Sequence, residues 1–286
     1  MTNEEPRISV VIPSYNCAST IAITLQSMID QTYKNLEIIV VDDASTDNTE
    51  RVVRDYMQKD SRIQYHKIAE EDPTRVNARG RNINAGWRAR NVGVQRANGE
   101  WVTFQDADDA SLLNRIEVQY ELAQKHNASH LTIEWLPLEP SLIGKKIDAE
   151  RYFSDHAHTW VGPQEITKIA RRSKGILPKV LGPLHRYIPF KVKQARIINR
   201  LFFGTLDTYP GVAGIPLVKK EVFTKVQFRP RDEREWPSFT GRGVDRDFDF
   251  KVAEVFKNSV YVEIPLYLYR TEQPQPHLAD YIKYIY

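Results

Sequence analysis

The sequence predicts an α/β fold with a doubly wound, mainly parallel sheet flanked by helices. In residues 7–135, short runs of β-branched and aliphatic residues alternate with segments of helical periodicity. This alternation is typical of strand–helix–strand units. Clusters of polar residues directly follow several of the expected strands. Ligands bind outside the carboxyl ends of the strands in such sheets, so these clusters are expected to share one rim.

Five short apolar runs in the first half have the length of buried strands. The first run is expected to stop at Pro13, and the second ends at Asp42-Asp43. Buried strands of a parallel sheet are nearly continuous in apolar residues, as the runs at 8–12, 36–41 and 101–104 are. The expected strands are residues 8–12, 36–41, 63–66, 101–104 and 131–135.

Helical segments are expected between these strands. Asp47 and Glu50 have the spacing of a capping box, which predicts the start of a helix. Residues 87–97 are predicted to form another helix, ended by Asn98-Gly99. Two further apolar helical faces are Ile21, Leu25 and Met28, and Leu113, Ile116, Tyr120 and Ala123.

The second half of the chain is expected to be less regular. Six prolines interrupt residues 136–206, and order is expected to resume at 214–222. A loop is expected at 236–243, a helix at 245–256, and strands at 260–264 and 266–269. We predict one domain, residues 7–270, with a donor half at about 7–135, an acceptor half at about 136–270 and a tail at 271–286.

Length and composition exclude several classes of protein. The 286 residues, 41% hydrophobic and 27% charged, are enough for one large core. No apolar run approaches the ~20 residues that span a bilayer, and Met1–Pro6 lacks the layout of a signal peptide. The single cysteine, Cys17, excludes an internal disulfide and a thiolate metal site. These features predict a cytoplasmic protein.

The positive charge is concentrated in one segment. Residues 166–206 contain ten Lys and Arg but no Asp or Glu, which leaves the rest of the chain at −7 against a total of +3. Apolar residues lie between these cations, so the segment is expected to form short helices at an anionic membrane surface or lipid-linked acceptor, making the enzyme peripheral to the membrane. The alternative is an ordinary core with a solvated charged face. Nucleic acid is a poorer fit, because the acidic remainder would repel it.

The Asp-x-Asp motif Asp106-Ala107-Asp108, after the strand at 101–104, suggests a reaction. Two carboxylates in a short loop can hold Mn²⁺ or Mg²⁺ while leaving positions open for phosphate oxygens. Such a cation would neutralise a departing diphosphate. The alternative is that these aspartates cap a helix starting near Leu112. The first strand is followed by neither Gly-x-Gly-x-x-Gly nor a Walker loop, so no dinucleotide site or P-loop is indicated.

Four segments, in this order and spacing, resemble the family-2 glycosyltransferases of the GT-A fold. They are Ile8 to Asn16, Leu36 to Asp47, Ala89-Arg90-Asn91, and Asn98 to Asp109. The resemblance covers residues 7–135 and continues more weakly to about 270. It implies transfer of a sugar from a nucleotide diphosphate donor, with UDP favoured, to a hydroxyl of a glycan or glycolipid, with inversion.

The resemblance also assigns donor-binding residues. Pro13 and Tyr15 would line the nucleobase pocket, and Asp43 would accept a hydrogen bond from a base N–H, typically of uracil. Asp106 would lie near the ribose and the metal. Asp108 would bind the Mn²⁺ or Mg²⁺ that bridges the diphosphate.

Several arginines are candidates for the donor phosphates. Arg90 falls on the Ala-Arg-Asn segment of the family and is expected to face the phosphates. Arg79 and Arg81 are further candidates. The alternative for all three is a solvated face.

An inverting transfer needs a general base for the incoming hydroxyl. In the family this is the aspartate of a Glu-Asp pair, and Gly243-Val244-Asp245 is the best match, with Val244 in place of the glutamate. Asp245 is therefore the expected base, and Asp247 and Asp249 are the alternatives. On a helix, Asp245 and Asp249 would share a face while Asp247 would not.

Two aromatic side chains have weaker assignments. Trp236 is expected either to stack on an acceptor sugar or to pack in the core. His277 either closes over the metal, as in some family members, or has no role.

Other functions are weighed against transfer. The chain lacks the Gln-x-x-Arg-Trp segment of processive synthases, which favours single additions in polysaccharide biosynthesis. A sugar nucleotidyltransferase would need a glycine-rich basic loop after the first strand, which is absent. An inactive nucleotide- or carbohydrate-binding module is the remaining alternative, because Val244 replaces the family glutamate.

Overall fold

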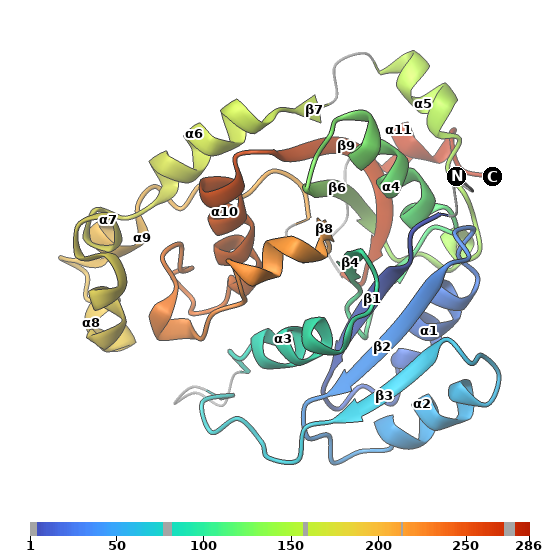
Figure 1. The fold of residues 1–286 in the computed structure, drawn as a ribbon, viewed down its shortest axis with the longest axis horizontal. Helices are drawn as coiled ribbons and strands as arrows, with labels where there is room; N and C mark the ends of the chain where they lie inside the picture. Colours follow the sequence, from blue (N-terminus) through green and yellow to red (C-terminus); the bar gives the residue numbers. More distant parts are fainter. Residues whose placement is uncertain (1–4, 77–81, 157–159, 213, 272–277) are drawn as a thin grey trace.

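The computed structural model describes residues 5–76, 82–156, 160–212, 214–271 and 278–286. Within these ranges one nine-stranded mixed sheet runs through the whole chain, in the order β3-β2-β1-β4-β8-β6-β9-β5, with β7 paired to β9 (Figure 1). The two arginines expected near the phosphates, Arg79 and Arg81, and the tail histidine His277 lie outside the described residues.

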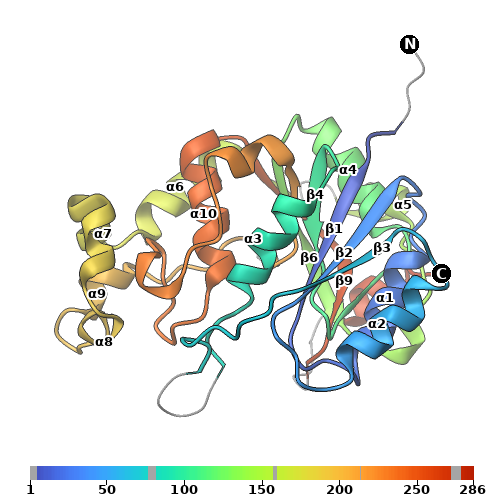
Figure 2. The same cartoon turned by 60° about the horizontal axis from the view of Figure 1, so that its bottom comes forward.

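The first half is a parallel sheet with helices on both faces, as predicted. Its strands are β1 (Ile8–Ser14), β2 (Leu36–Asp42), β3 (Ile63–Lys67) and β4 (Trp101–Phe104). Alternate β1 side chains enter two different cores: Val10 packs with α1 (Ile21–Ile29), and Val11 packs with α3 (Trp87–Arg96). The helix α2 (Thr49–Met57) lies beside α1 (Figure 2).

The contact between α3 and β1 is unusually close. A Cβ built on Gly93 would lie only 2.3 Å from Cγ1 of Val11. A side chain at this position would therefore push the helix away from the strand. The absence of a side chain at Gly93 fixes the height of α3 above the sheet, and with it the position of Arg90 one turn earlier.

The second half continues the same sheet with strands of both directions. The strand β8 (Leu217–Lys219) is antiparallel to both of its neighbours, β4 and β6 (His130–Pro137), and β9 (Ser259–Tyr269) is parallel to β6. The remaining elements that pack around it are β5 (Ala110–Ser111), β7 (Trp160–Val161), α4 (Arg115–Lys125), α5 (Ala149–Asp155), α6 (Pro163–Ser173), α10 (Val244–Phe256) and α11 (Leu278–Ile282).

Two expected strand boundaries were wrong, both at prolines. The strand β1 continues through Pro13 to Ser14, because β4 pairs with β1 only as far as Val11, so the missing N–H of Pro13 breaks no ladder. The late strands expected on either side of Pro265 are one strand. Pro265 lies opposite Glu134, where the β6–β9 register is irregular and a donor can be missing.

Two expected helix caps also differ from the structure. Asp47 does accept a hydrogen bond from the Thr49 N–H at 3.0 Å, but Glu50 pairs with Arg54 instead of completing a capping box. Helix α4 begins after Asn114, and β5 separates it from Asp106–Asp109. The alternative that these aspartates cap a helix near Leu112 is therefore wrong.

The basic segment forms short helices separated by turns, as its prolines predicted. They are α6, α7 (Ile176–Leu181), the 3₁₀ helix η2 (Gly182–Tyr187), α8 (Phe190–Lys193) and α9 (Asn199–Phe203). The helices α7, α8 and α9 gather at one end of the molecule, away from the sheet (Figures 1 and 2). No helix in the described part of the chain is long and apolar enough to cross a membrane.

Candidate active site

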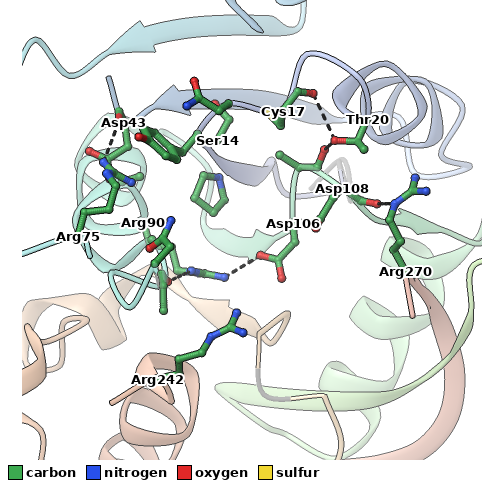
Figure 3. Close-up of a pocket in the computed structure, with 18 of the residues that line it drawn as sticks. Ser14, Cys17, Thr20, Asp43, Arg75, Arg90, Asp106, Asp108, Arg242 and Arg270 are labelled. Atoms are coloured by element: carbon green, nitrogen blue, oxygen red, sulfur yellow. Dashed lines mark hydrogen bonds and ion pairs between the residues drawn. The ribbon is translucent and has the colours of Figure 1, made fainter. Parts of the chain in front are cut away.

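A pocket of about 550 Å³ opens at the carboxyl ends of β1, β2 and β4 (Figure 3). Seven of the site residues expected from the sequence line it: Pro13, Tyr15, Asp43, Arg90, Asp106, Asp108 and Asp245. The first six come from the parallel half, and Asp245 comes from the start of α10. Residues more than two hundred positions apart thus meet around one cavity.

A buried ion pair and an aromatic ring form one end of the pocket. Arg75 lies 2.8 Å from the Asp43 carboxylate, and both side chains are 3% exposed. The Arg75 guanidinium also lies over the Tyr15 ring, 3.7 Å from its centroid. Burial raises the pKa of Asp43, and the Arg75 cation opposes that rise. Oδ1 of Asp43 accepts no hydrogen bond from the described residues, so an acceptor is available there.

Arg90 joins the two halves of the pocket. It is 4% exposed, and its Nη2 lies 2.7 Å from Asp106 and 3.6 Å from Asp245. Its Nη1 donates to the Ala85 carbonyl at 2.6 Å. Burial by itself would lower the pKa of Arg90, but Asp245 and Asp106 outweigh it, so the guanidinium stays charged. A solvated surface role for Arg90 is therefore wrong.

Asp106 lies at the centre of this charge cluster. Burial raises its pKa to about 6; Asp245 and Asp108 push it in the same direction, and Arg90 opposes them. Its Oδ2 faces the space beside Gly214 and Asp245, as the 3.7 Å distance to a Cβ built on Gly214 shows. The carboxylate therefore has one oxygen tied to Arg90 and one directed toward open space.

The carboxylates of the β4 loop fit a cation that is shared with a ligand. Asp108 is exposed at the pocket, whereas Asp109 is occupied by the Tyr267 hydroxyl at 2.7 Å and the Arg270 N–H at 2.6 Å. Among the described residues no group of three or more His, Cys, Asp or Glu could hold a metal. Mg²⁺ in nucleotide sites is often held by one or two carboxylates plus phosphate oxygens, and Asp106 with Asp108 meets that need.

Of the three carboxylates considered as the base, only Asp245 lines the pocket. Asp247 is fully buried against Arg229 at 2.8 Å. Asp249 is fully buried against His130 Nε2 at 3.0 Å, one helical turn deeper than Asp245. Val244, where the family has glutamate, is buried in the core formed with Phe248.

Three arginines of the pocket were not predicted: Arg75, Arg242 and Arg270. Arg242 stands between Gly241 and Gly243, whose φ angles of 85° and 87° are left-handed and favour glycine. Arg270 donates from Nε to the Asp108 carbonyl at 2.7 Å. For these three arginines, the only local indication in the sequence was Gly-Arg-Gly at 241–243, which is typical of a special backbone conformation.

Trp236 does not stack on an acceptor, because it is fully buried. Its Nε1–H donates to the Ala170 carbonyl at 2.8 Å, which joins the loop before α10 to α6. Besides Tyr15, the pocket is lined by the aromatic side chain of Tyr269, which is 42% exposed and packs edge-on against Trp135.

The comparison with known families agrees with this geometry. The model of the family described as "Glycosyl transferase family 2" matches residues 9–136. Residues 9–136 are therefore similar to glycosyl transferase family 2.

Named relatives show the same similarity to glycosyltransferases. The chain is 36% identical over 161 residues to the UDP-Glc:alpha-D-GlcNAc-diphosphoundecaprenol beta-1,3-glucosyltransferase WfgD of Escherichia coli, covering 56% of this chain and 53% of WfgD. It is 34% identical over 121 residues to the glycosyltransferase GlyG of Streptococcus pneumoniae, covering 42% of this chain and 36% of GlyG. The chain thus spans about half the length, or less, of these relatives.

Solved structures confirm the GT-A fold. The mannosyltransferase PcManGT of Pyrobaculum calidifontis, in complex with GDP-Man and Mn²⁺, matches 96% of this chain and 60% of its own with a TM-score of 0.54 at 16% identity. TarS of S. aureus, in complex with UDP-GlcNAc, matches 94% of this chain and 60% of its own with a TM-score of 0.52 at 17% identity. The likeness of fold continues well past the family 2 match, to the region that holds Arg242, Asp245 and Arg270.

Proposed function

We propose that this chain is an inverting, metal-dependent, non-processive glycosyltransferase. It moves a sugar from a nucleotide diphosphate donor, with UDP favoured, to a hydroxyl of a glycan or lipid-linked glycan. The observation that carries the proposal is that Arg90 pairs with both Asp106 and Asp245. Asp106 follows strand β4 in the first half and Asp245 comes from the second half, so both carboxylates line one pocket. The name of WfgD, with its UDP-glucose donor and undecaprenol-linked acceptor, supports the choice of substrates.

The nucleobase is assigned to the Asp43 end of the pocket. Oδ1 of Asp43 is a buried acceptor that has no donor among the described residues, which suits the imide N–H of uracil. The Tyr15 ring, held against Arg75, supplies a flat surface on which a base can stack. An acceptor group that is buried and unpaired costs free energy until a ligand satisfies it.

The diphosphate is assigned to the other side of the pocket. Asp108 and Asp106 would hold Mn²⁺ or Mg²⁺, which supplies Lewis-acid neutralisation of the leaving diphosphate when bound. Arg242 and Arg270 both line this region and bring further positive charge to it. Arg90 stays charged through Asp106 and Asp245, so its role is to fix the two carboxylates relative to each other.

Asp245 is assigned as the general base. The acceptor hydroxyl oxygen bonds to the anomeric carbon from the face opposite the diphosphate, while the bond from that carbon to the diphosphate oxygen breaks with its electron pair. Asp245 takes the hydroxyl proton. Asp245 lies in the first turn of α10 and lines the pocket, as a base for the incoming hydroxyl must.

An inactive binding module is disfavoured by the place of Val244. That side chain is fully buried in the core rather than directed at the pocket, so the valine removes no carboxylate from the lining. Tyr269, exposed beside Asp108 and Arg270 in the lining, is a candidate surface for the acceptor sugar.

A thermal-shift screen with UDP-sugars and Mn²⁺, followed by nucleotide release, tests the proposal. A donor at ~100-fold its dissociation constant should stabilise the fold by ~2.7 kcal/mol. Asp108→Ala should lose that metal-dependent shift and most turnover while folding normally. Asp30→Ala, at an exposed aspartate that ends α1 and does not line the pocket, is the matched control. Near-normal turnover of Asp108→Ala, or of the native chain in excess chelator, contradicts the metal assignment. A thermal shift with GDP-sugars but not with UDP-sugars contradicts the choice of UDP as the donor nucleotide.

A further inference from the structure

Exposed apolar side chains are concentrated in one part of the molecule. We call residues 175–206, which contain α7, η2, α8 and α9, the tip. Of the seventeen large hydrophobic side chains exposed in the described chain, the tip holds eight: Ile176, Val180, Leu184, Tyr187, Val192, Ile197, Leu201 and Leu206. Val180 is 75% exposed and Ile197 is 92% exposed. Single exposed hydrophobics are normal, but a concentration of this kind marks an interaction surface.

These side chains are ordered along the helices rather than scattered. Ile176, Val180, Leu184 and Tyr187 follow one another at intervals of four, four and three residues through α7 and η2. Two pairs each lie on one face of one helix: Ile176 and Val180 on α7, and Leu184 and Tyr187 on the 3₁₀ helix η2. Gly182, with a φ of 52°, separates the two helices, and we call these four exposed side chains the apolar stripe.

Positive charge surrounds the stripe without acidic partners. The tip contains six Lys and Arg and no Asp or Glu. Five of the six are exposed, and none of these five forms an ion pair with a described residue: Lys179, Arg186, Lys191, Arg196 and Arg200. Some exposed cations elsewhere are neutralised, as Lys67 and Arg54 are by Glu50.

The inner side of the tip is firmly attached to the rest of the protein. Phe190, Phe202 and Phe203 form its own small core. The sixth cation, Lys193, is buried and donates to the Asp232 carbonyl at 2.5 Å, and Gln194 donates to the Phe239 carbonyl at 2.8 Å. The apolar stripe is thus displayed by a folded unit.

The tip also contacts the loop that reaches the pocket. A Cβ on Gly241 would lie 3.3 Å from the Phe190 ring, and the Phe203 and Phe239 rings are 6.0 Å apart. Arg242, the next residue, lines the donor pocket. A surface bound by the tip is therefore one short loop away from the site of transfer.

We propose that the tip docks on an anionic lipid bilayer. The apolar stripe would enter the headgroup region, and the unpaired cations would lie at the level of the lipid phosphates. A second copy of this chain is a poorer occupant, because it would oppose one acid-free cationic surface to another. The inference rests on the proposed function in one respect, since a lipid-linked acceptor would be presented at such a surface.

Cosedimentation of the full chain with vesicles tests this inference. The vesicles are phosphatidylcholine alone or mixed with phosphatidylglycerol, and contain no acceptor, so failure here leaves the transferase assignment untouched. Binding to the anionic vesicles should be strong at about 0.1 M salt and weak at about 1 M, because the screening length falls from ~10 Å to ~3 Å. Each cation contributes about a fivefold factor near a charged leaflet.

Two variants and one control separate the contribution of the cations to vesicle binding from that of the apolar side chains. Changing Lys179, Arg186, Lys191 and Arg196 to Ser should lower binding to anionic vesicles at least tenfold, and Val180→Ser with Ile197→Ser should lower it severalfold at unchanged salt dependence. The control changes four exposed cations elsewhere to Ser: Arg51, Lys125, Lys145 and Lys225. Three outcomes overturn the inference: equal binding to neutral and anionic vesicles, binding to neither, or equal loss in the control. Concentration-dependent self-association that disappears in the tip variants, without vesicle binding, assigns the surface to a second copy instead.

Discussion

The two halves of the molecule position their pocket residues by different means. In the donor half, Asp43 and Asp106 follow parallel strands, so the register of the sheet places them. In the acceptor half, the loop and helix that carry Arg242 and Asp245 are held by glycine conformations and buried ion pairs. The first arrangement depends on backbone hydrogen bonds, and the second depends on side-chain charges that other residues must neutralise.

The charges of the acceptor half form a network around Glu235. Its carboxylate pairs with Arg229 and Lys174, and with Lys251 at 3.2 Å. Burial alone would raise the pKa of Glu235, but these cations outweigh it and hold the pKa at about 2. Since Lys174 lies at the base of the tip and Arg229 also binds Asp247 of α10, the network joins the tip to the helix that carries Asp245.

The largest effect is expected on turnover, from a change of Asp245, the proposed general base. Asp245→Asn should lower the turnover number 10²- to 10⁴-fold while leaving donor affinity unchanged, because an amide cannot take the acceptor proton. Donor affinity from calorimetry and turnover from nucleotide release give the two quantities.

The control for this variant is Asp249→Asn, one turn along the same helix. Burial, and then Asp245, raise the pKa of Asp249 well above its usual value, so an amide is a close mimic of the neutral carboxyl. Its turnover should stay within a few-fold of the native value. A dead Asp249→Asn beside an active Asp245→Asn would assign the base to the buried residue.

The second largest effect is expected on the free energy of unfolding, from a change of Glu235. Because the folded pKa of Glu235 is depressed from 4.5 to about 2, its stabilisation is complete above pH 4.5 and is lost as the pH falls toward 2. Glu235→Gln should lower the free energy of unfolding by about 3 kcal/mol at neutral pH, and the difference from the native chain should narrow in acid. Urea unfolding at several pH values measures it, and Glu221→Gln, at an exposed glutamate, is the control. If the loss of unfolding free energy in Glu235→Gln does not change with pH, the ion pairs of Glu235 are not its cause.

The smallest effect is expected in the donor half. Arg75→Met removes the cation that opposes protonation of the buried Asp43. The pKa of Asp43 should rise further, so UDP affinity should fall about tenfold and become weaker still as the pH is lowered. Tyr15→Phe keeps the ring and serves as the control. Titration calorimetry at two pH values measures both, and a pH-independent loss for Arg75→Met would remove Asp43 from base recognition.

The donor half could be predicted from the sequence because its signals are local. Asp43, Asp106 and Asp108 directly follow apolar runs, and the carboxyl ends of parallel strands share a rim. Arg75 could not be predicted this way, since it lies in a stretch without periodicity and reaches Asp43 only through the folded chain.

The acceptor half could be predicted only in outline. Helical spacing grouped Asp245 with Asp249, but burial, which depends on His130 in a distant strand, separated them. The short strand β8 gave no periodic signal, although it joins the two halves of the sheet between β4 and β6. The prolines and the weak periodicity of this half therefore did not prevent it from continuing the sheet.

The close contact between Gly93 and Val11 has a consequence for reading sequence variants of this protein. Position 93 contacts no pocket and carries no functional group, yet it sets where Arg90 meets Asp106. A methyl group added there would displace the guanidinium from its carboxylates and impair transfer without touching any substrate. A mutational scan would then score a glycine on the sheet-facing side of α3 as a catalytic residue, although its whole contribution is the space it leaves empty.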